Sequence, residues 1–324
     1  MKKRAFFITM ILIVVSIQEI SFALEVETHQ AINYYIADST LNGFSLGGYL
    51  KQNCGFSQGI AENFNGLRVD EWLSIGGKYE DKPPGWYNKI PYLRSVNHFH
   101  DPITKQGFSG FWGTSLFDGT SSVLWSQWPL GAQTLQVLGT GNYSWFDARD
   151  YFYRALTSPD KTTRDKNFAD TFRGLGQVMH LVEDVSVPEH TRNDAHGTCP
   201  QAHHYECWAL KNVTINKLPN YPPIYFDSSA IGNSNPLAPV PIANLFDTNQ
   251  YNGTNPAVTL QNNVGLSEFA NANFFSQHTI FKNYLHPAEG NTTANLVEQY
   301  ARDGKKDQVW YVHKKEPIGV GLDY

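Results

Sequence analysis

Two residues that can bind one ion, His180 and Asp184, stand four positions apart in an apolar stretch. A spacing of four places both side chains on one face of a helix, one turn apart. Imidazole and carboxylate are ligands that zinc uses in catalytic sites, where one position stays open for water. Bound zinc lowers the pKa of that water and stabilises the charge of a phosphoryl transition state. This pair therefore indicates a candidate metal site.

Further histidine and acid groupings support a metal site, because one such pair alone is a weak signal. His98 and His100 occur with Asp101 in the run NHFHDP. His203 and Glu206 are three positions apart, which again corresponds to one helical face. The other residues of interest are His29, near the start of the chain, and His190, which follows Pro188. Several such groupings in one chain favour a cluster of metal ions.

The run from Gly176 to His190, GQVMHLVEDVSVPEH, resembles the HxxxD…PxH segment of the zinc-dependent phospholipase C and P1/S1 nuclease superfamily. The run NHFHDP resembles the histidine motif of the phospholipase branch. The segment from His203 to Trp208 resembles the later helix that supplies a histidine and an acid. The resemblance extends from about Leu24 to about Tyr284, and its central motif is the most specific part.

The resemblance implies three zinc ions held by nine residues. The mature α-amino group of Leu24 and the side chain of His29 would hold one ion. A second ion would use His98, His180 and Asp184, with Asp184 bridging two ions. The third would use His190, His203 and Glu206. An acid before the HF motif is implied as ligand or general base, and Asp81 is the choice.

Two ligand assignments have alternatives. Glu80 is the alternative to Asp81, since both precede the HF motif. His204 is the alternative to His203, because the family usually spaces its last histidine and acid by four, and position 202 is Ala. Glu183 is interpreted as a solvated helix residue or as a group behind a ligand, and His100 as a member of a hydrogen-bond network or a surface residue.

The resemblance implies hydrolysis of a phosphate ester, with phospholipase C-like action on a phospholipid as the first hypothesis. Choline-preferring members place aromatic residues where this chain has Lys82 and Ser95, so the sequence does not specify which phospholipid headgroup would be recognised. A single-strand nuclease is the alternative enzyme, and it would need aromatic side chains on which bases stack. Trp112, Trp125 and Trp128 could supply them or could pack within their loop. An exported metal-binding protein without turnover is the non-enzyme alternative.

The N-terminal segment predicts export. Lys2, Lys3 and Arg4 precede an apolar run, Phe6 to Ile17, that is too short to span a bilayer comfortably. Ser21-Phe22-Ala23 then forms a small-x-small cleavage site, which is typical of a secretory signal peptide. We therefore expect residues 1–23 to be removed, leaving a secreted or periplasmic protein with no stable membrane anchor. An uncleaved anchor is the alternative interpretation.

Charge and cysteine content restrict the partners and the covalent links. Removal of residues 1–23 takes away three of the 25 basic and one of the 30 acidic residues, so the net charge becomes about −7. A mildly acidic chain argues against nonspecific duplex binding, although a nucleic acid could still reach a metal centre. Cys199 and Cys207 are close enough in sequence to pair, which would leave Cys54 free.

The elements that position these residues are expected to be helices. Apolar residues recur at three- and four-residue steps from Phe168 to Val182, which predicts a long helix over Thr163 to Val185. Further helices are expected over Thr28–Ala37, Leu67–Ile75, Trp145–Leu156, Leu266–Tyr284 and Thr293–Arg302. Loops are expected over 81–91, over 105–129 at the surface, and over 218–256 as an excursion. The predicted class is a single all-α domain over residues 24–324, with long loops.

Overall fold

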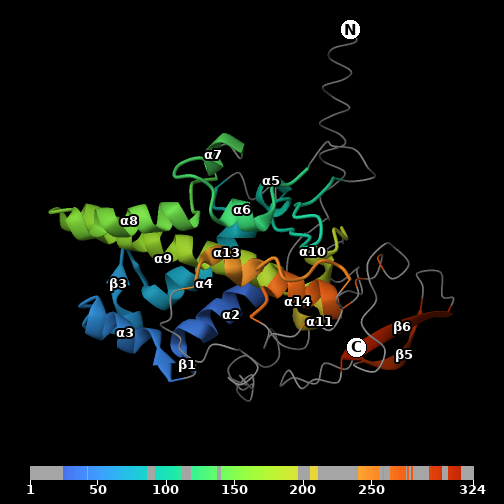
Figure 1. Ribbon diagram of the computed structural model, residues 1–324. Helices are drawn as coiled ribbons and strands as arrows, with labels where there is room; N and C mark the ends of the chain where they lie inside the picture. The colour runs from blue at the N-terminus through green and yellow to red at the C-terminus, as the bar shows by residue number, and fades with distance from the viewer. Residues whose placement is uncertain are drawn as a thin grey trace, which may run out of the picture.

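The computed structural model describes a mostly helical protein, in agreement with the expected all-α class (Figure 1). It describes residues 25–41, 43–85, 92–110, 118–136, 140–195, 205–210, 240–254, 263–274, 292–300 and 306–314, with residues 258, 276 and 279. Leu24, His203 and His204 lie outside these ranges. No described helix is long and apolar enough to cross a membrane.

The described helices follow one another along the chain, with two short antiparallel strand pairs among them and a longer pair after the last helix. They are α2 (Val26–Asp38), α3 (Leu46–Asn53), the 3-10 helix η1 (Gly59–Ala61), α4 (Val69–Asp81), α5 (Tyr92–Ser95), α6 (Ser122–Ser126), α7 (Gln133–Gln136), α8 (Trp145–Thr157), α9 (Lys161–Asp184), α10 (Pro188–Thr191), α11 (Tyr205–Ala209), α13 (Ile242–Phe246) and α14 (Leu266–Asn273). The antiparallel pairs are β1 (Thr40–Leu41) with β2 (Phe44–Ser45), β3 (Asn63–Phe64) with β4 (Leu67–Arg68), and β5 (Thr292–Tyr300) with β6 (Lys306–Lys314).

Helix α9 is the central element, and it packs against both α4 and α8, while α2 packs against α4 (Figure 1). Asp160 caps its N-terminus by accepting a hydrogen bond from the backbone N of Thr163 at 2.7 Å. Its buried face includes Phe168, Phe172, Gly176, His180 and Asp184 at successive four-residue steps. The apolar stripe that packs the helix into the core therefore continues directly into the two candidate ligands.

Helices α4 and α9 approach closely at two glycines. A Cβ atom on Gly176 would lie 2.2 Å from the carbonyl oxygen of Leu73, and one on Gly76 would lie 2.4 Å from that of Arg173. Asn33 of α2 donates hydrogen bonds from Nδ2 to the carbonyl oxygens of Leu73 and Gly176, at 3.1 and 3.2 Å. This contact fixes α2, α4 and α9 together near their candidate ligands, since Asn33 lies one turn after His29 and Gly176 one turn before His180.

Two apolar clusters stabilise the described part of the chain. One contains Leu50, Phe56, Phe64, Val69, Leu73, Phe168 and Phe172. The other contains Trp125, Leu181, Val185 and Phe246. The second cluster corrects two expectations, since Trp125 lies in a segment expected at the surface and Phe246 in the expected excursion. Both side chains are fully buried, because Trp125 of α6 and Phe246 of α13 pack in one cluster with Leu181 and Val185 at the end of α9.

Three helix predictions had wrong ends or the wrong type. The chain forms strand β5, and not a helix, over Thr292–Tyr300, where β-branched and aromatic residues in both strands favour a hairpin with β6. Helix α4 begins at Val69, because Asn65 and Gly66 adopt positive φ and form a tight turn between β3 and β4. It continues to Asp81, beyond the expected end at Ile75.

The helix expected over Leu266–Tyr284 ends at Asn273, where the next residue, Phe274, has an extended backbone. The side chain of Asn273 donates from Nδ2 to the carbonyl oxygens of Phe269 and Val258, at 2.7 and 2.9 Å. Side chains of this type offer the backbone alternatives to a helix. Of the cysteines, Cys207 is disulfide-bonded and Cys54 is a free thiol, which agrees with the expected pairing.

Candidate metal centre

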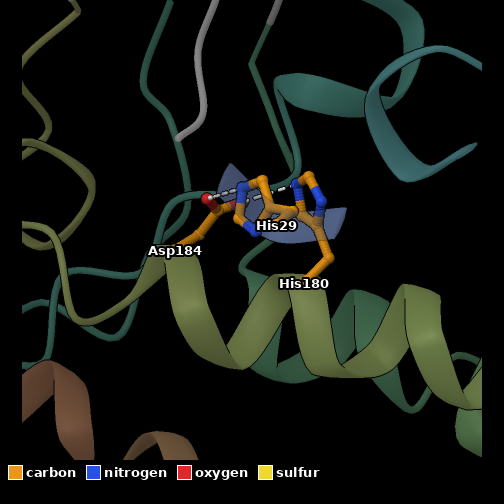
Figure 2. Close-up of side chains that lie close together, drawn as sticks. All are labelled: His29, His180 and Asp184. Carbon is orange, nitrogen blue, oxygen red and sulfur yellow. Dashed lines mark ion pairs between the residues drawn. The ribbon is translucent and has the colours of Figure 1, made fainter. Parts of the chain in front are cut away.

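Asp184, at the C-terminal end of α9, lies at the centre of the site (Figure 2). Its Oδ2 atom is 2.9 Å from Nδ1 of His98 and 3.1 Å from Nε2 of His180. Its Oδ1 atom is 3.2 Å from Nε2 of His29 and 3.8 Å from Nδ1 of His190. The two oxygens of one buried carboxylate thus face two different groups of imidazoles.

The first group combines residues from α4, the segment after α5, and α9. Oδ1 of Asp81 lies 3.6 Å from Nδ1 of His98 and 3.8 Å from Nε2 of His180. The two imidazole nitrogens are 3.3 Å apart. Two ligands bound tetrahedrally to one zinc ion at 2.0–2.1 Å lie about 3.3 Å apart. Asp81, His98 and His180 therefore have the spacing of donors to one ion, and His29, His180 and Asp184 form a second such set.

Hydrogen bonds orient the lone pair of His180 toward this point. Its Nδ1 atom lies 2.6 Å from the carbonyl oxygen of Gly77, so Nδ1 is the donor and Nε2 carries the lone pair. Both carboxylate oxygens of Asp184, Oδ2 of Asp81 and Nε2 of His29 are buried and make no hydrogen bond, although charged groups surround them. Buried polar atoms without hydrogen bonds are costly, so these residues fit a bound cation.

The second group contains His29 and Oδ1 of Asp184. The His29 ring stacks on the His180 ring, with centroids 3.5 Å apart, and its Nδ1 atom lies 2.5 Å from Oε2 of Glu183. The backbone N of His29 donates to the carbonyl oxygen of Glu25 at 3.3 Å, so the chain before α2 lies beside the site. Leu24, the implied third partner, is outside the described residues.

A third group begins at His190, whose Nδ1 atom faces the same oxygen of Asp184, Oδ1, as His29 does. Nε2 of His190 is 3.2 Å from Oε1 of Glu206, which joins α10 to α11. The His190 ring stacks on Phe99, with centroids 4.5 Å apart. Both polar side chains are buried. His203 and His204 lie outside the described residues, so the choice between them stays a prediction.

The charges of the side chains in the site compensate one another. Burial alone would lower the pKa of His29 and His98, but Asp184 and the neighbouring acids raise these pKa values to about 10 and about 9. Burial opposes ionisation of Asp184, yet the four surrounding imidazoles keep its pKa well below the usual value. Burial and the other imidazoles hold the pKa of His190 at about 3. A cation would take the place of the protons on His29 and His98.

The structure distinguishes the two acids that precede the HF motif. Asp81 faces the inner nitrogens of His98 and His180, whereas Glu80 lies on the outer side of the His98 ring, among a set of donors. Its Oε2 atom accepts hydrogen bonds from Arg94 at 2.8 Å and Gln177 at 2.7 Å, and Oε1 accepts one from Trp125 at 2.8 Å. Asp81 is therefore the candidate ligand, and Glu80 lies behind His98.

Two further residues of the NHFHDP run, His100 and Asp101, have structural contacts. His100 lies 2.8 Å from both Ser121 Oγ and Asp247 Oδ2, which confirms a hydrogen-bond network. Asp101 caps a turn by accepting from the backbone N of Ile103 at 2.8 Å. Sequence reasoning did not identify Glu80 as a group behind His98 or the carbonyl of Gly77. The sequence signal that could have identified Glu80 was its position directly before Asp81, which makes a pair of consecutive acids.

Comparison of the chain with protein-family models and with curated proteins gives no match.

Proposed function

We propose that this protein is an exported zinc-dependent phosphodiesterase with phospholipase C-like activity. The observation that carries the proposal is the position of Asp184, whose two oxygens face separate groups of imidazoles. A carboxylate placed in this way can bridge two ions, and sites of two or more metals are suited to in-line displacement at phosphorus. The resemblance of the HxxxD…PxH and NHFHDP runs to the zinc phospholipase C and P1/S1 nuclease superfamily supports the same chemistry.

The residues have distinct roles in this proposal. Asp81, His98, His180 and Asp184 would hold one zinc ion, His29 and Leu24 with Asp184 a second, and His190, Glu206 and His203 or His204 the third. Zinc bound there would supply an activated water and stabilise phosphoryl charge. Asp81 Oδ2 is buried without a hydrogen bond, so it is placed to accept a proton from a nucleophile bound beside the ligands. Burial of every described ligand keeps bulk water from this proton transfer.

A phospholipid is the proposed substrate, and a single-stranded nucleic acid is the alternative to be tested. The NHFHDP run is closer to the phospholipase branch than to the nucleases. A nuclease would need aromatic platforms, but Trp125 is fully buried and its indole N–H is bonded to Glu80. The expected signal peptide gives such an enzyme access to lipids outside the cytoplasm.

The proposal is tested on mature protein that begins at Leu24. Zinc content is measured by mass spectrometry, and hydrolysis is measured on phosphatidylcholine, single-stranded DNA and a chromogenic phosphodiester. We expect about three zinc ions per chain and fastest hydrolysis of the phospholipid. A content of one or none in folded, zinc-supplied protein contradicts a trinuclear site. Full zinc without turnover of any substrate indicates the metal-binding alternative.

Asp184→Asn is the decisive variant. Loss of the bridging carboxylate should release zinc and abolish turnover while α9 persists, as measured by circular dichroism. Asp165→Asn is a matched control, because Asp165 lies in the same helix and pairs with Lys161 four residues away. The control should keep zinc and activity. Equal behaviour of the two variants would place the metal elsewhere.

A further inference from the structure

The imidazoles around Asp184 differ in what their outer nitrogens contact. The outer nitrogens of His180 and His29 lie 2.6 Å from the carbonyl oxygen of Gly77 and 2.5 Å from Oε2 of Glu183. The outer nitrogen of His98, Nε2, is buried and makes no hydrogen bond. The acid that faces it is Glu80, whose Oε1 is 3.7 Å away, longer than a hydrogen bond.

Glu80 is a fixed carboxylate. Its side chain is buried, and three side chains donate to it: Arg94 and Gln177 to Oε2, and Trp125 to Oε1, all at 2.7–2.8 Å. Arg94 is itself held by Gln133, Thr140 and the carbonyl of Gly141. Oε1 therefore keeps a lone pair on the side of His98, since an ionised carboxylate oxygen accepts more than one hydrogen bond.

The position of Glu80 matters because an imidazole can bind a metal only through its unprotonated nitrogen. A neutral imidazole has one N–H, and the nitrogen that carries it cannot bind a metal. Nδ1 of His98 is the atom that faces Asp184, at 2.9 Å. His98 can act as a ligand there only if its proton resides on Nε2. Carboxylates behind metal-bound histidines commonly fix this tautomer.

We propose that Glu80 is a positioning residue for His98, which accepts a hydrogen bond from Nε2 in the metal-loaded site and so directs the Nδ1 lone pair at the ion. Trp125 and Gln177 fix the carboxylate of Glu80 in the required orientation, and Arg94 balances its charge. The inference rests on the metal centre of the proposed function, and it does not depend on the substrate. A purely structural role, in which Glu80 only neutralises Arg94, makes different predictions.

Glu80→Gln tests the proposal, because it keeps the shape but turns one oxygen into a donor. The new amide NH2 group would have to face other donors, either Arg94 and Gln177 on one side or Trp125 and His98 on the other. We expect one zinc ion to bind about 10–100-fold more weakly, measured by competition with a chromophoric chelator. The absorption spectrum of cobalt-substituted protein should also change. Glu27→Gln, at an exposed residue of α2, is the matched control and should leave both unchanged.

The two roles are separated by the metal-free protein. Its free energy of unfolding in urea reports the structural role, whereas zinc affinity and the cobalt spectrum report positioning. Lower stability with affinity and spectrum equal to the wild type overturns the proposal. If Glu80→Gln fails to fold, Trp125→Phe keeps an aromatic ring and removes one donor to Oε1. Trp125→Phe should bind the same zinc ion more weakly. Unchanged zinc affinity in this variant overturns the proposal equally.

Failure of this inference differs from failure of the proposed function. A wild-type protein that binds zinc but hydrolyses no phosphodiester contradicts the proposed activity. Weaker binding of one zinc ion by Glu80→Gln would still support the positioning role in that case. Hydrolysis by the wild type, together with wild-type zinc affinity in Glu80→Gln, supports the activity and overturns the role of Glu80.

Discussion

Oε2 of Glu183 lies 2.5 Å from Nδ1 of His29, while Asp184, the next residue of α9, faces the other nitrogen of the same ring. Two consecutive acids therefore hold one imidazole from both sides. The contact with Glu183 would fix the proton on Nδ1 and leave the Nε2 lone pair for an ion shared with Asp184. Of the two interpretations of Glu183 from sequence, the structure supports a group behind a ligand.

The first prediction concerns Glu183. Glu183→Gln removes the charge that stabilises the His29 N–H, so the ion on His29 should bind about tenfold more weakly. Helical spacing alone suggested a mild effect, because Glu183 lies on the face next to Asp184. Zinc titration with a competing chelator provides the measurement, and Glu27→Gln serves as control. Identical titration curves for both variants would show that Glu183 does not support the ligand.

The second prediction concerns the contact between α4 and α9. A Cβ atom on Gly176 would lie 2.2 Å from the carbonyl oxygen of Leu73, so Gly176→Ala must separate the helices. We expect a loss of about 1–3 kcal/mol in the free energy of unfolding of the metal-free protein, typical of overpacking. Zinc binding should weaken too, because Asp81 ends α4 and His180 lies on α9.

Gly174→Ala provides the control for that experiment. The added Cβ would lie 3.1 Å from the Cβ of Ala148, a contact that a small shift relieves. Alanine also favours a helix over glycine by about 1 kcal/mol, which offsets the tight contact. Unfolding in urea should therefore give nearly the wild-type value. If Gly174→Ala lowered the free energy of unfolding as much as Gly176→Ala, both effects would have to be attributed to packing along α9 and not to its contact with α4.

The third prediction concerns pH and Asp247. Burial opposes its ionisation, but hydrogen bonds with His100 and Lys105 lower the pKa of Asp247 to about 2. The unfolded value is about 3.9, so the native state favours the ionised form. This stabilisation is fully present above pH 4 and is lost as the pH falls through 2. Because its partner Lys105 is exposed, solvent screening limits this stabilisation to about 1 kcal/mol.

Asp247→Asn should therefore lower the free energy of unfolding by about 1 kcal/mol at pH 7, with a smaller difference at pH 3.5. Urea unfolding of chelator-treated protein at pH 7, 5 and 3.5 provides the measurement, so that loss of metal does not contribute. Asp118→Asn, at an exposed residue, should show no such dependence. A difference that is constant with pH would exclude ionisation of Asp247 as its cause.

Local sequence signals predicted the central part of this site. The apolar periodicity of α9 and the spacing of His180 and Asp184 determine which side chains share a face, and the structure brings both to one point. The choice between Glu80 and Asp81 could not be made in this way. It depends on where α4 ends and on donors from Arg94, Trp125 and Gln177, which approach from three other segments.

Strand β5 illustrates a different limit. Its stretch, TTANLVEQY, contains residues compatible with either a helix or a strand, so periodicity did not separate the two. The pairing with β6, whose QVWYV core is rich in β-branched and aromatic residues, decides in favour of the hairpin. The strand with which a segment pairs cannot be seen from that segment alone.

The final prediction concerns the mature N-terminus. The resemblance implies that the α-amino group of Leu24 binds the same ion as His29, and this amine exists only after cleavage behind Ala23. In the structure the carbonyl oxygen of Glu25, the residue after Leu24, accepts a hydrogen bond from the backbone N of His29. Glu25, which would be the second residue of the cleaved chain, is therefore bonded to the first turn of the helix that carries this ligand.

One additional N-terminal residue would move the amine by about 3.5 Å along an extended backbone. Zinc–nitrogen bonds of about 2.0–2.1 Å do not tolerate such a displacement. Protein that begins Met-Leu24, with the Met retained, should hold less zinc and lose more than about tenfold in activity compared with protein that begins at Leu24. His29→Ala should cause a similar loss, because it removes the partner ligand of the same ion. Leu24→Trp should be tolerated, since only backbone atoms of this residue bind.

Hydrolysis of a chromogenic phosphodiester and zinc content are measured on the same samples, so that loss of metal and loss of turnover can be compared directly. The tolerated variant Leu24→Trp controls for any change at this position. Full zinc and full activity in the Met-extended protein would show that the amine is not a ligand. His29 and Asp184 would then hold their ion without the N-terminus, and the resemblance would fail at this end of the chain while the HxxxD part of the site remained.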